Sequence, residues 1–325
     1  MSLNRRQLIA TSAASAALAT VGLPAYAQSF PNKPVRLIVP YPPGGSSDII
    51  ARAISQLLSE SLGQPVVVEN RAGANGNIGA DLVAKSAPDG HTMLLCDVGA
   101  LAISPSVYTK LAFNPSKDLR GVTMLAYSPH MLAVHPSVKA NNLKELVELS
   151  KTSDLNFAVT AVGSAPHVAG VAVQRATGAK WIYVPYKGGS QAVTDTVAGQ
   201  TQVIMNGMLA TLPHVQSGRL KVLGISKKTR MPLVGSVPTL AEQGVTGFES
   251  GTWQGVLVAN GTPPAIIARL NSELIKIIRS PDVRARLTGQ GAEVVTMQPA
   301  EQDALFERER KRWGEVVAEA NIKLD

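Results

Sequence analysis

Two short stretches of similar sequence carry the residues best suited to bind a small ligand. VPYPPGGSSDIIAR occupies residues 39 to 52, and VPYKGGSQAVTD occupies residues 184 to 195. Each follows an apolar run typical of a buried strand and leads into a segment with helical spacing. In parallel α/β sheets, ligands bind beyond the carboxyl ends of strands, which is where both stretches fall. We therefore expect the two stretches to face each other across one binding cleft.

The first stretch has the composition of an anion-binding loop. Pro42 stiffens it, Gly45 allows the backbone to approach a ligand, and Ser46 and Ser47 add hydroxyl donors. The following helix would present free N–H groups to a carboxylate or phosphate. The pattern is not that of a nucleotide loop, because it lacks both G-x-x-x-x-G-K-[ST] and G-x-G-x-x-G. The alternative is a tight turn capped by Ser47 or Asp48, and Asp48 could also receive an ammonium or hydroxyl group.

Two further turns join a strand to a helix in the second half of the chain. The second stretch repeats the glycine pair and serine of the first, and residues 163 to 167 form another turn suited to an anion. The ligand candidates in these turns are Gly163, Ser164, His167, Gly188, Gly189 and Ser190. His167 would either donate a hydrogen bond to a ligand or simply occupy the first helical turn.

Three other residues are weaker candidates for chemistry. Asn206 ends an expected strand, so its amide would point into the cleft or serve a turn. Trp253 lies on an expected hinge strand, where it would cover a ligand or pack in a core. Cys96 ends an apolar strand and is interpreted as a buried small hydrophobe.

Neither a metal site nor a catalytic centre is indicated. The 5 histidines form no H-x-x-x-H or H-E-x-x-H pair, and with 1 cysteine there is no Cys pair. The sequence has no G-x-S-x-G elbow, and Asp48 and Asp195 are acid–base candidates only by their position after the two loops. We therefore expect no metal and no cofactor. An exported α/β hydrolase or isomerase that uses the same cleft is the alternative.

Short apolar strands alternate with amphipathic helices in two series. The first series is expected to comprise residues 35–39, 49–58, 66–68, 77–86 and 92–96. The second is expected to begin with a helix at residues 143–150 and to run to residue 225. Strand-like segments at residues 122–134 and 251–258 lie between and after the series, which suits a two-strand hinge. The pattern predicts an α/β, two-lobed periplasmic binding protein fold of type II-like arrangement, each lobe a mainly parallel sheet flanked by helices.

The N-terminus has the pattern of an export signal. Arg5 and Arg6 precede an alanine-rich apolar run, and Ala25-Tyr26-Ala27 matches an A-x-A cleavage site. We expect cleavage after Ala27 and a periplasmic location. A membrane anchor is the alternative, although the apolar run is short for a span of roughly 20 residues. The paired arginines leave the twin-arginine route open.

Composition excludes several classes of protein. The 325-residue chain is 45% hydrophobic and 17% charged, as expected of a globular protein. The full chain has a net charge of +8, and loss of residues 1–27 leaves about +6. The basic residues are spread out, so we expect no nucleic-acid partner, whereas a mild positive charge suits an anionic ligand.

With these residues in place, the chain resembles the Bug-type extracytoplasmic solute receptors, the substrate-binding subunits of tripartite tricarboxylate transporters. The resemblance covers essentially the whole chain after the signal. It is carried by PYPPGGSSDIIAR, VVVENRAGANGNIGADLVAKSAPDGHTMLL, ISPSVY, VPYKGGSQAVTD, LPHVQSGRLKVLGIS and SVPTLAEQGVTGFESGTWQGVLVANGTP. It implies a periplasmic receptor that closes on a small carboxylated solute and delivers it to a membrane permease.

The resemblance also implies positions for the ligand contacts. The family's first ligand loop falls on Tyr41 to Asp48, and the opposing contacts fall on residues 163 to 167 and on Lys187 to Ser190. Tyr41 stands where phenylalanine is more usual, and Val171 stands where the family often has glutamate. Residues 96 to 100 replace a Ser/Thr-rich loop, and Asp97 would disfavour a second carboxylate if it points inward.

We therefore expect a receptor that captures a small carboxylate by hinge closure. Residues 28–126 and 251–325 would form one lobe, and residues 127–250 the other. Its partners would be the carboxylate, the permease subunits and, in a further reading, the periplasmic domain of a sensor kinase. We expect a monomer. An amino acid, a dicarboxylate, a tricarboxylate and an aromatic acid all remain open as ligands.

Overall fold

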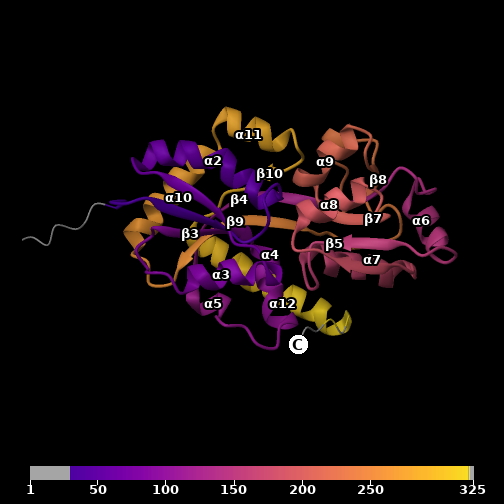
Figure 1. Cartoon of the computed structure of the whole chain (residues 1–325), viewed down its shortest axis with the longest axis horizontal. Helices are drawn as coiled ribbons and strands as arrows, with labels where there is room; N and C mark the ends of the chain where they lie inside the picture. The colour runs from indigo at the N-terminus through magenta and orange to yellow at the C-terminus, as the bar shows by residue number, and fades with distance from the viewer. Residues whose placement is uncertain (1–29, 321, 323–325) are drawn as a thin grey trace, which may run out of the picture.

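The computed structural model describes residues 30–320 and 322. The expected signal peptide, its cleavage site after Ala27 and the paired arginines lie outside the described residues. In the described part of the chain, no helix combines the length and the apolar character needed to cross a bilayer. Figure 1 shows two groups of strands and helices lying side by side along the long axis of the molecule.

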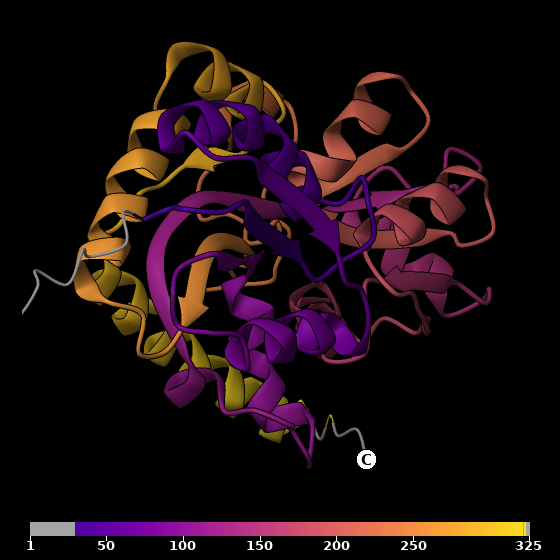
Figure 2. The ribbon, with the colours of Figure 1, turned by 60° about the vertical axis from the view of Figure 1, so that its left-hand side comes forward.

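The group on the left of Figure 1 uses elements from both ends of the described chain. β1 (Val35–Val39) lies between β2 (Val66–Asn70) and β3 (Thr92–Asp97) and is parallel to both. The helices of this group are α2 (Ser46–Leu62), α3 (Asn77–Ala84), α4 (Val98–Val107), α5 (Pro115–Asp118), α10 (Pro264–Ile278), α11 (Pro281–Thr288) and α12 (Pro299–Ala320), with the short 3-10 helix η1 (Ala74–Gly76). In Figure 2 the gold C-terminal helices lie beside the indigo N-terminal elements.

The group on the right of Figure 1 is built from the middle of the chain. β5 (Asn156–Val159) lies between β6 (Ile182–Pro185) and β7 (Val203–Gly207) and is parallel to both. The remaining elements of this group are β8 (Lys221–Ile225), α6 (Leu143–Ser150), α7 (Ala165–Thr177), α8 (Gly189–Val197), α9 (Met208–Gln216) and η2 (Pro232–Val234).

Two strands pass between the groups. β4 (Leu119–Val134) pairs with β9 (Gly251–Ala259) along its first part, and with β7 and β8 from His130 or Met131 onward. β9 also pairs with β3, and the short β10 (Glu293–Val294) pairs with β4. All of these pairings are antiparallel, so the sheet is mixed, and its parallel pairs are confined to β1–β3 and β5–β7. The expected lobe boundaries at residues 126/127 and 250/251 fall within β4 and at the start of β9.

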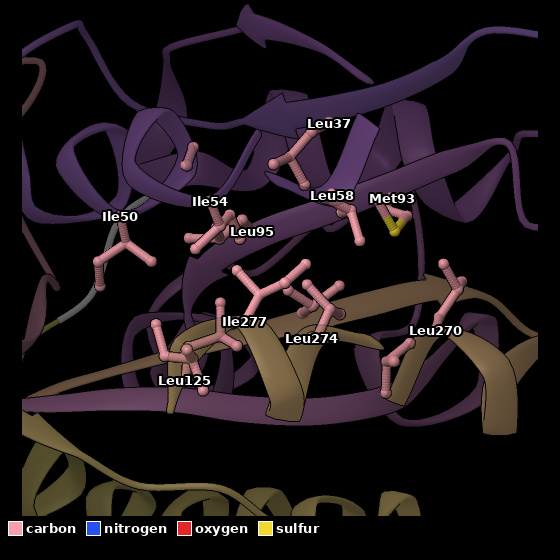
Figure 3. Packing of buried hydrophobic residues seen from close by; sticks show 14 of the residues in the cluster. Leu37, Ile50, Ile54, Leu58, Met93, Leu95, Leu125, Leu270, Leu274 and Ile277 are labelled. Atoms are coloured by element: carbon pink, nitrogen blue, oxygen red, sulfur yellow. The ribbon is translucent and has the colours of Figure 1, made fainter. Parts of the chain in front are cut away.

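The core of the first group lies between α2, the sheet and α10. Figure 3 shows Ile54 and Leu58 of α2 near Leu274 and Ile277 of α10, with Leu95 of β3 in the same cluster. Ile54 and Leu58 are fully buried, and their spacing of four places them on one face of α2. Burying a side chain of this kind contributes roughly 1.5–3 kcal/mol. This packing holds the N-terminus of α2 at the edge of the sheet.

A separate apolar cluster joins the two groups. Ile103 and Val107 of α4 pack with Val168 of α7 and with Trp313 and Val317 of α12. The C-terminal helix therefore packs against elements of both groups, as the yellow α12 beneath their junction shows in Figure 1.

Several helices differ from the sequence expectations. Residues 96 to 100 were interpreted as a loop, but β3 continues to Asp97 and α4 begins at Val98. α4 is buried nearly all round, so it has no polar face to reveal a helical period. α9 and α11 were also absent from the sequence reading. The predicted α6 has the same bounds in the structure, residues 143–150.

Candidate functional site

The first loop, residues 40–48, is fixed by the side chain of Asp48. Its carboxylate accepts hydrogen bonds from the Gly44 N–H, Arg52 Nε and Asn70 Nδ2, at 2.9, 2.9 and 3.0 Å. Burial acts to raise the pKa of Asp48, but these hydrogen bonds outweigh it and hold the pKa below its ordinary value. Gly44 has a φ of +83°, which a glycine adopts without strain. The carboxylate proposed as cap or ligand contact thus serves the loop itself.

The N-terminus of α2 opens directly from this loop. Gly45 is the N-cap and no side chain caps the helix, so its first N–H groups have no side-chain acceptor. Ser47 Oγ donates a 2.6 Å hydrogen bond to Gln254 Oε1 of β9. Ser46 Oγ lies 3.2 Å from where a Cβ on Gly207 would be, at the end of β7. The two serines therefore face a hinge strand and the second group of elements.

The second loop, residues 185–190, approaches the first so closely that only glycine fits. A Cβ on Gly188 would lie 2.4 Å from Pro42 Cδ, and a Cβ on Gly44 would lie 3.6 Å from Ser190 Cβ. Gly188 is the N-cap of α8, and again no side chain caps the helix. The Lys187 side chain is exposed, and the backbone N–H of Lys187 donates a hydrogen bond to Gln191 Oε1. Two uncapped helix N-termini thus meet where the loops touch.

The third turn, residues 163–167, is closed by its own side chains. Ser164 caps α7 by accepting from the His167 N–H at 3.3 Å, and His167 Nδ1 accepts from the Gly163 N–H at 3.0 Å. Burial lowers the pKa of His167 to about 4, so the ring is neutral near pH 7. Asn75 Nδ2 donates to the Gly163 carbonyl at 3.2 Å and so links this turn to the first group.

A small cavity lies between the three turns. Its volume is about 50 Å³. Seven of the predicted residues line it: Tyr41, Gly45, Ser46, Ser47, Ser164, Gly189 and Asn206. The other lining residues are Asn75, Asp97, Ala100, Thr160, Pro166, Thr252 and Gln254. Most of these groups are uncharged hydrogen-bonding groups, which suits recognition of a polar ligand rather than an apolar one.

The remaining predicted residues lie around the cavity rather than in its lining. Pro42, Gly188 and Ser190 pack where the two loops touch, Asp48 anchors the first loop, and Gly163 and His167 lie within the third turn. Lys187 is exposed. That the fifteen predicted residues bind a ligand stays a prediction.

Trp253 belongs to a different hollow of about 530 Å³. Its ring packs on Tyr127 with the centroids 4.4 Å apart, and Lys227 and Arg312 line the same hollow. The backbone of Trp253 faces the other way, because its N–H donates to Asp97 Oδ1 at 3.0 Å.

The sequence reading missed several residues of the cavity. Thr252 and Gln254 alternate with Trp253 along β9, so the strand period could have placed them on the face opposite the tryptophan. Asn75 lies in a run of positive φ angles from Gly73 to Gly76. The glycine and asparagine residues of this segment favour such a turn and could have indicated it from the sequence. Asn206 was found, and its amide donates to Thr211 Oγ1 at 3.2 Å.

The described residues contain no cluster of three or more His, Cys, Asp or Glu side chains that could hold a metal ion. Cys96 is buried, and burial raises the pKa of its thiol well above the usual range. A thiol of this kind is protonated at neutral pH and is a poor nucleophile.

Comparison with known proteins places the chain in a family. The model of the tripartite tricarboxylate transporter family receptor matches residues 50–322. BugT of Bordetella pertussis is 37% identical over 325 residues, covering 99% of this chain and 100% of BugT. The structure of R. palustris Rpa4515 with adipate has a TM-score of 0.87 and 32% identity over 91% of this chain and 100% of that one.

MatC of Rhodopseudomonas palustris with bound malate has a TM-score of 0.83 and 32% identity over 89% of this chain and 100% of that one. These likenesses extend over the whole two-group fold and confirm the resemblance seen in the sequence. The chain belongs to the tripartite tricarboxylate transporter receptor family, and within it is similar to the Bug-type solute receptors.

Proposed function

We propose that the protein is a periplasmic receptor that captures a small organic anion in the cavity between its loops. One observation carries the proposal: the uncapped N-termini of α2 and α8 meet beside one small polar cavity. Free N–H groups and the positive ends of helix dipoles stabilise a carboxylate. No Lys or Arg is among the described residues that line the cavity, so the backbone would supply most of the positive potential.

The ligand would be enclosed by hinge closure. β4 and β9 are the strands that pass between the two groups, so rotation about them would separate the loops. Opening would break the Pro42–Gly188 contact and the Asn75–Gly163 hydrogen bond. The lobes of this mechanism are residues 28–126 with 251–325, and residues 127–250.

Relatives support the class of ligand. Rpa4515 is seen with adipate and MatC with malate, and both ligands are small carboxylates. By the family's role, the receptor would deliver its ligand to the permease subunits of a tripartite transporter. We further propose export with cleavage after Ala27, action as a monomer, and binding without catalysis, since the solved relatives are receptors. Contact with a sensor kinase is a separate proposal.

A titration panel tests the proposed function. Each carboxylic acid is paired with its neutral amide, and unfolding temperature and heat of binding are measured on the purified protein. Ligand at 100 times its Kd stabilises the folded state by about 2.7 kcal/mol. We expect at least one acid to stabilise the protein and its amide to fail. Equal effects of acid and amide, or no binding by any acid, would reject the carboxylate site. Recovery of the unchanged acid after incubation tests the absence of turnover.

A further inference from the structure

Asp97 is an acidic side chain within the cavity. It ends β3, caps α4 and is only 5% exposed, and it lines the cavity together with Tyr41 and Ala100. It is the only carboxylate among the described residues of the lining. A buried carboxylate in a binding cavity restricts which ligands can enter.

Backbone groups hold the carboxyl of Asp97 in place. Oδ1 accepts hydrogen bonds from the N–H groups of Gly99 and Trp253, each at 3.0 Å. Within the described residues, no Lys, Arg or His forms an ion pair with Asp97. Burial raises the pKa of Asp97 to about 7, despite the backbone N–H groups that favour its charged form.

The other titratable groups near Asp97 add no positive charge. Tyr41 is partly buried and Cys96 is buried, and the nearby Asp97 adds to the desolvation that raises both of their pKa values. Glu309 of α12 is a further acidic neighbour and acts to raise the pKa of Asp97. An incoming cationic group would therefore meet a carboxylate that has no cation of its own.

We propose that Asp97 makes the receptor select a small amino acid, whose ammonium group it would bind, over a dicarboxylate of similar length. This inference rests on the proposed function, in which the helix N-termini bind the ligand's carboxylate. The ammonium would give Asp97 its missing cation, whereas a second carboxylate would meet a like charge in a buried site. Leaving a buried charged group without its partner penalises the wrong ligand strongly.

The size of the closed cavity agrees with a short ligand. A cavity needs a volume of about 10–15 Å³ to hold one buried water. The 50 Å³ of this cavity therefore holds about four groups of that size. A small amino acid suits this space better than a long diacid such as the adipate bound by Rpa4515.

Two matched sets of ligands test the inference by calorimetry. The first is propanoate, 3-aminopropanoate and succinate, which differ only in the group at the far carbon. The second is propanoate, alanine and methylmalonate, which differ at the carbon next to the carboxylate. We expect the ammonium member of at least one set to bind at least tenfold more tightly than its dicarboxylate member.

Asp97→Asn tests the residue itself, because asparagine keeps an oxygen to cap α4 but carries no charge. We expect the preference for the ammonium member to shrink at least tenfold. Asp282→Asn, in the first turn of α11, is the matched control and should leave the preference unchanged. If Asp97→Asn does not fold, the inference is tested by the affinities of the wild-type protein for the ammonium and dicarboxylate members of each set.

The outcomes separate this inference from the function on which it rests. Equal or tighter binding of the dicarboxylates, or of acids without an ammonium group, would overturn the role of Asp97 and leave the carboxylate site standing. An unchanged preference in a folded Asp97→Asn variant would also overturn it. If none of the acids binds, including those of the titration panel, both proposals are rejected.

Discussion

The first and second loops share the motifs Val-Pro-Tyr and Gly-Gly-Ser, but different interactions fix their backbones. In the first loop, Asp48 ties the backbone of Gly44 to Arg52 and Asn70, and Ser47 is bonded to β9. In the second loop an uncharged side chain takes the corresponding place: Gln191 Oε1 accepts a hydrogen bond from the Lys187 backbone N–H at 3.2 Å, and Gly188 packs against Pro42.

Their tyrosines differ as well. Tyr41 lines the cavity, whereas Tyr186 is not among the lining residues and packs against an apolar cluster that includes Ala192 and Val193 of α8. Burial, followed by a hydrogen bond with Asp195 of α8, raises the pKa of Tyr186 to about 12. The repeated sequence motif therefore preserves backbone geometry, in which a strand end leads to an uncapped helix. The two copies use their side chains differently. The first loop would act as a fixed platform and the second as a backbone surface that closes on it.

Enlarging Gly188 should have the greatest effect on ligand binding. Gly188→Val would place a side chain where a Cβ alone already lies 2.4 Å from Pro42, so the loops could not close. We expect the affinity for the ligand found by the panel to fall by about 100-fold, or ~2.7 kcal/mol. Calorimetry measures this loss. Gly235→Val is the control, because its Cβ would lie 3.6 Å from the nearest atom outside its neighbours. Unchanged affinity in Gly188→Val would show that closure does not bring these loops together.

Removing the anchor of the first loop should reduce both stability and affinity. Asp48→Ala leaves the Gly44 N–H without its acceptor and removes one of the two acceptors of the Asn70 amide, the other being the Tyr41 carbonyl. We expect a loss of about 1–3 kcal/mol in the free energy of unfolding, measured with urea, and about tenfold in affinity, or ~1.4 kcal/mol. A stable variant with normal affinity would refute the platform role.

As the pH is lowered, the third turn should lose the stabilising contribution of His167 at a higher pH than the first loop loses that of Asp48. The folded pKa of His167, about 4, lies below its ordinary 6.5, so its stabilising contribution is present above pH 6.5 and is lost as the pH falls toward 4. Asp48, whose pKa is also depressed, loses its contribution only below its ordinary 3.8. Between pH 7.5 and 5, the wild type should lose about 1–2 kcal/mol more stability than His167→Gln in urea unfolding. Equal losses would contradict the buried neutral ring.

Lys187 should have the smallest effect, although it belongs to the second loop. Its side chain is exposed and lies outside the cavity lining. Lys187→Ala should change stability by less than about 0.5 kcal/mol and affinity by less than about twofold. A tenfold loss of affinity in calorimetry would mean that the loop contributes a side chain as well as backbone.

Local patterns predicted the loops and most strands and helices, because each depends on residues close in sequence. β1 ends at Val39 as the apolar run indicates, and α6 spans the predicted residues 143–150. α4 escaped prediction because it is apolar on nearly every face. The cavity contacts of Gln254 and Asn75 depend on which strands and turns meet in space, and a single sequence does not specify that pairing. Asp97 was recognised as a conditional candidate, and only the fold shows that it points inward.

A ligand-bound crystal structure tests the central claim most directly. The protein would be crystallised with the tightest acid found by the panel. We predict carboxylate density between the N-termini of α2 and α8, within hydrogen-bond distance of the backbone N–H groups there. Density for the ligand in the hollow beside Trp253 and Lys227, with none between the two loops, would contradict the account.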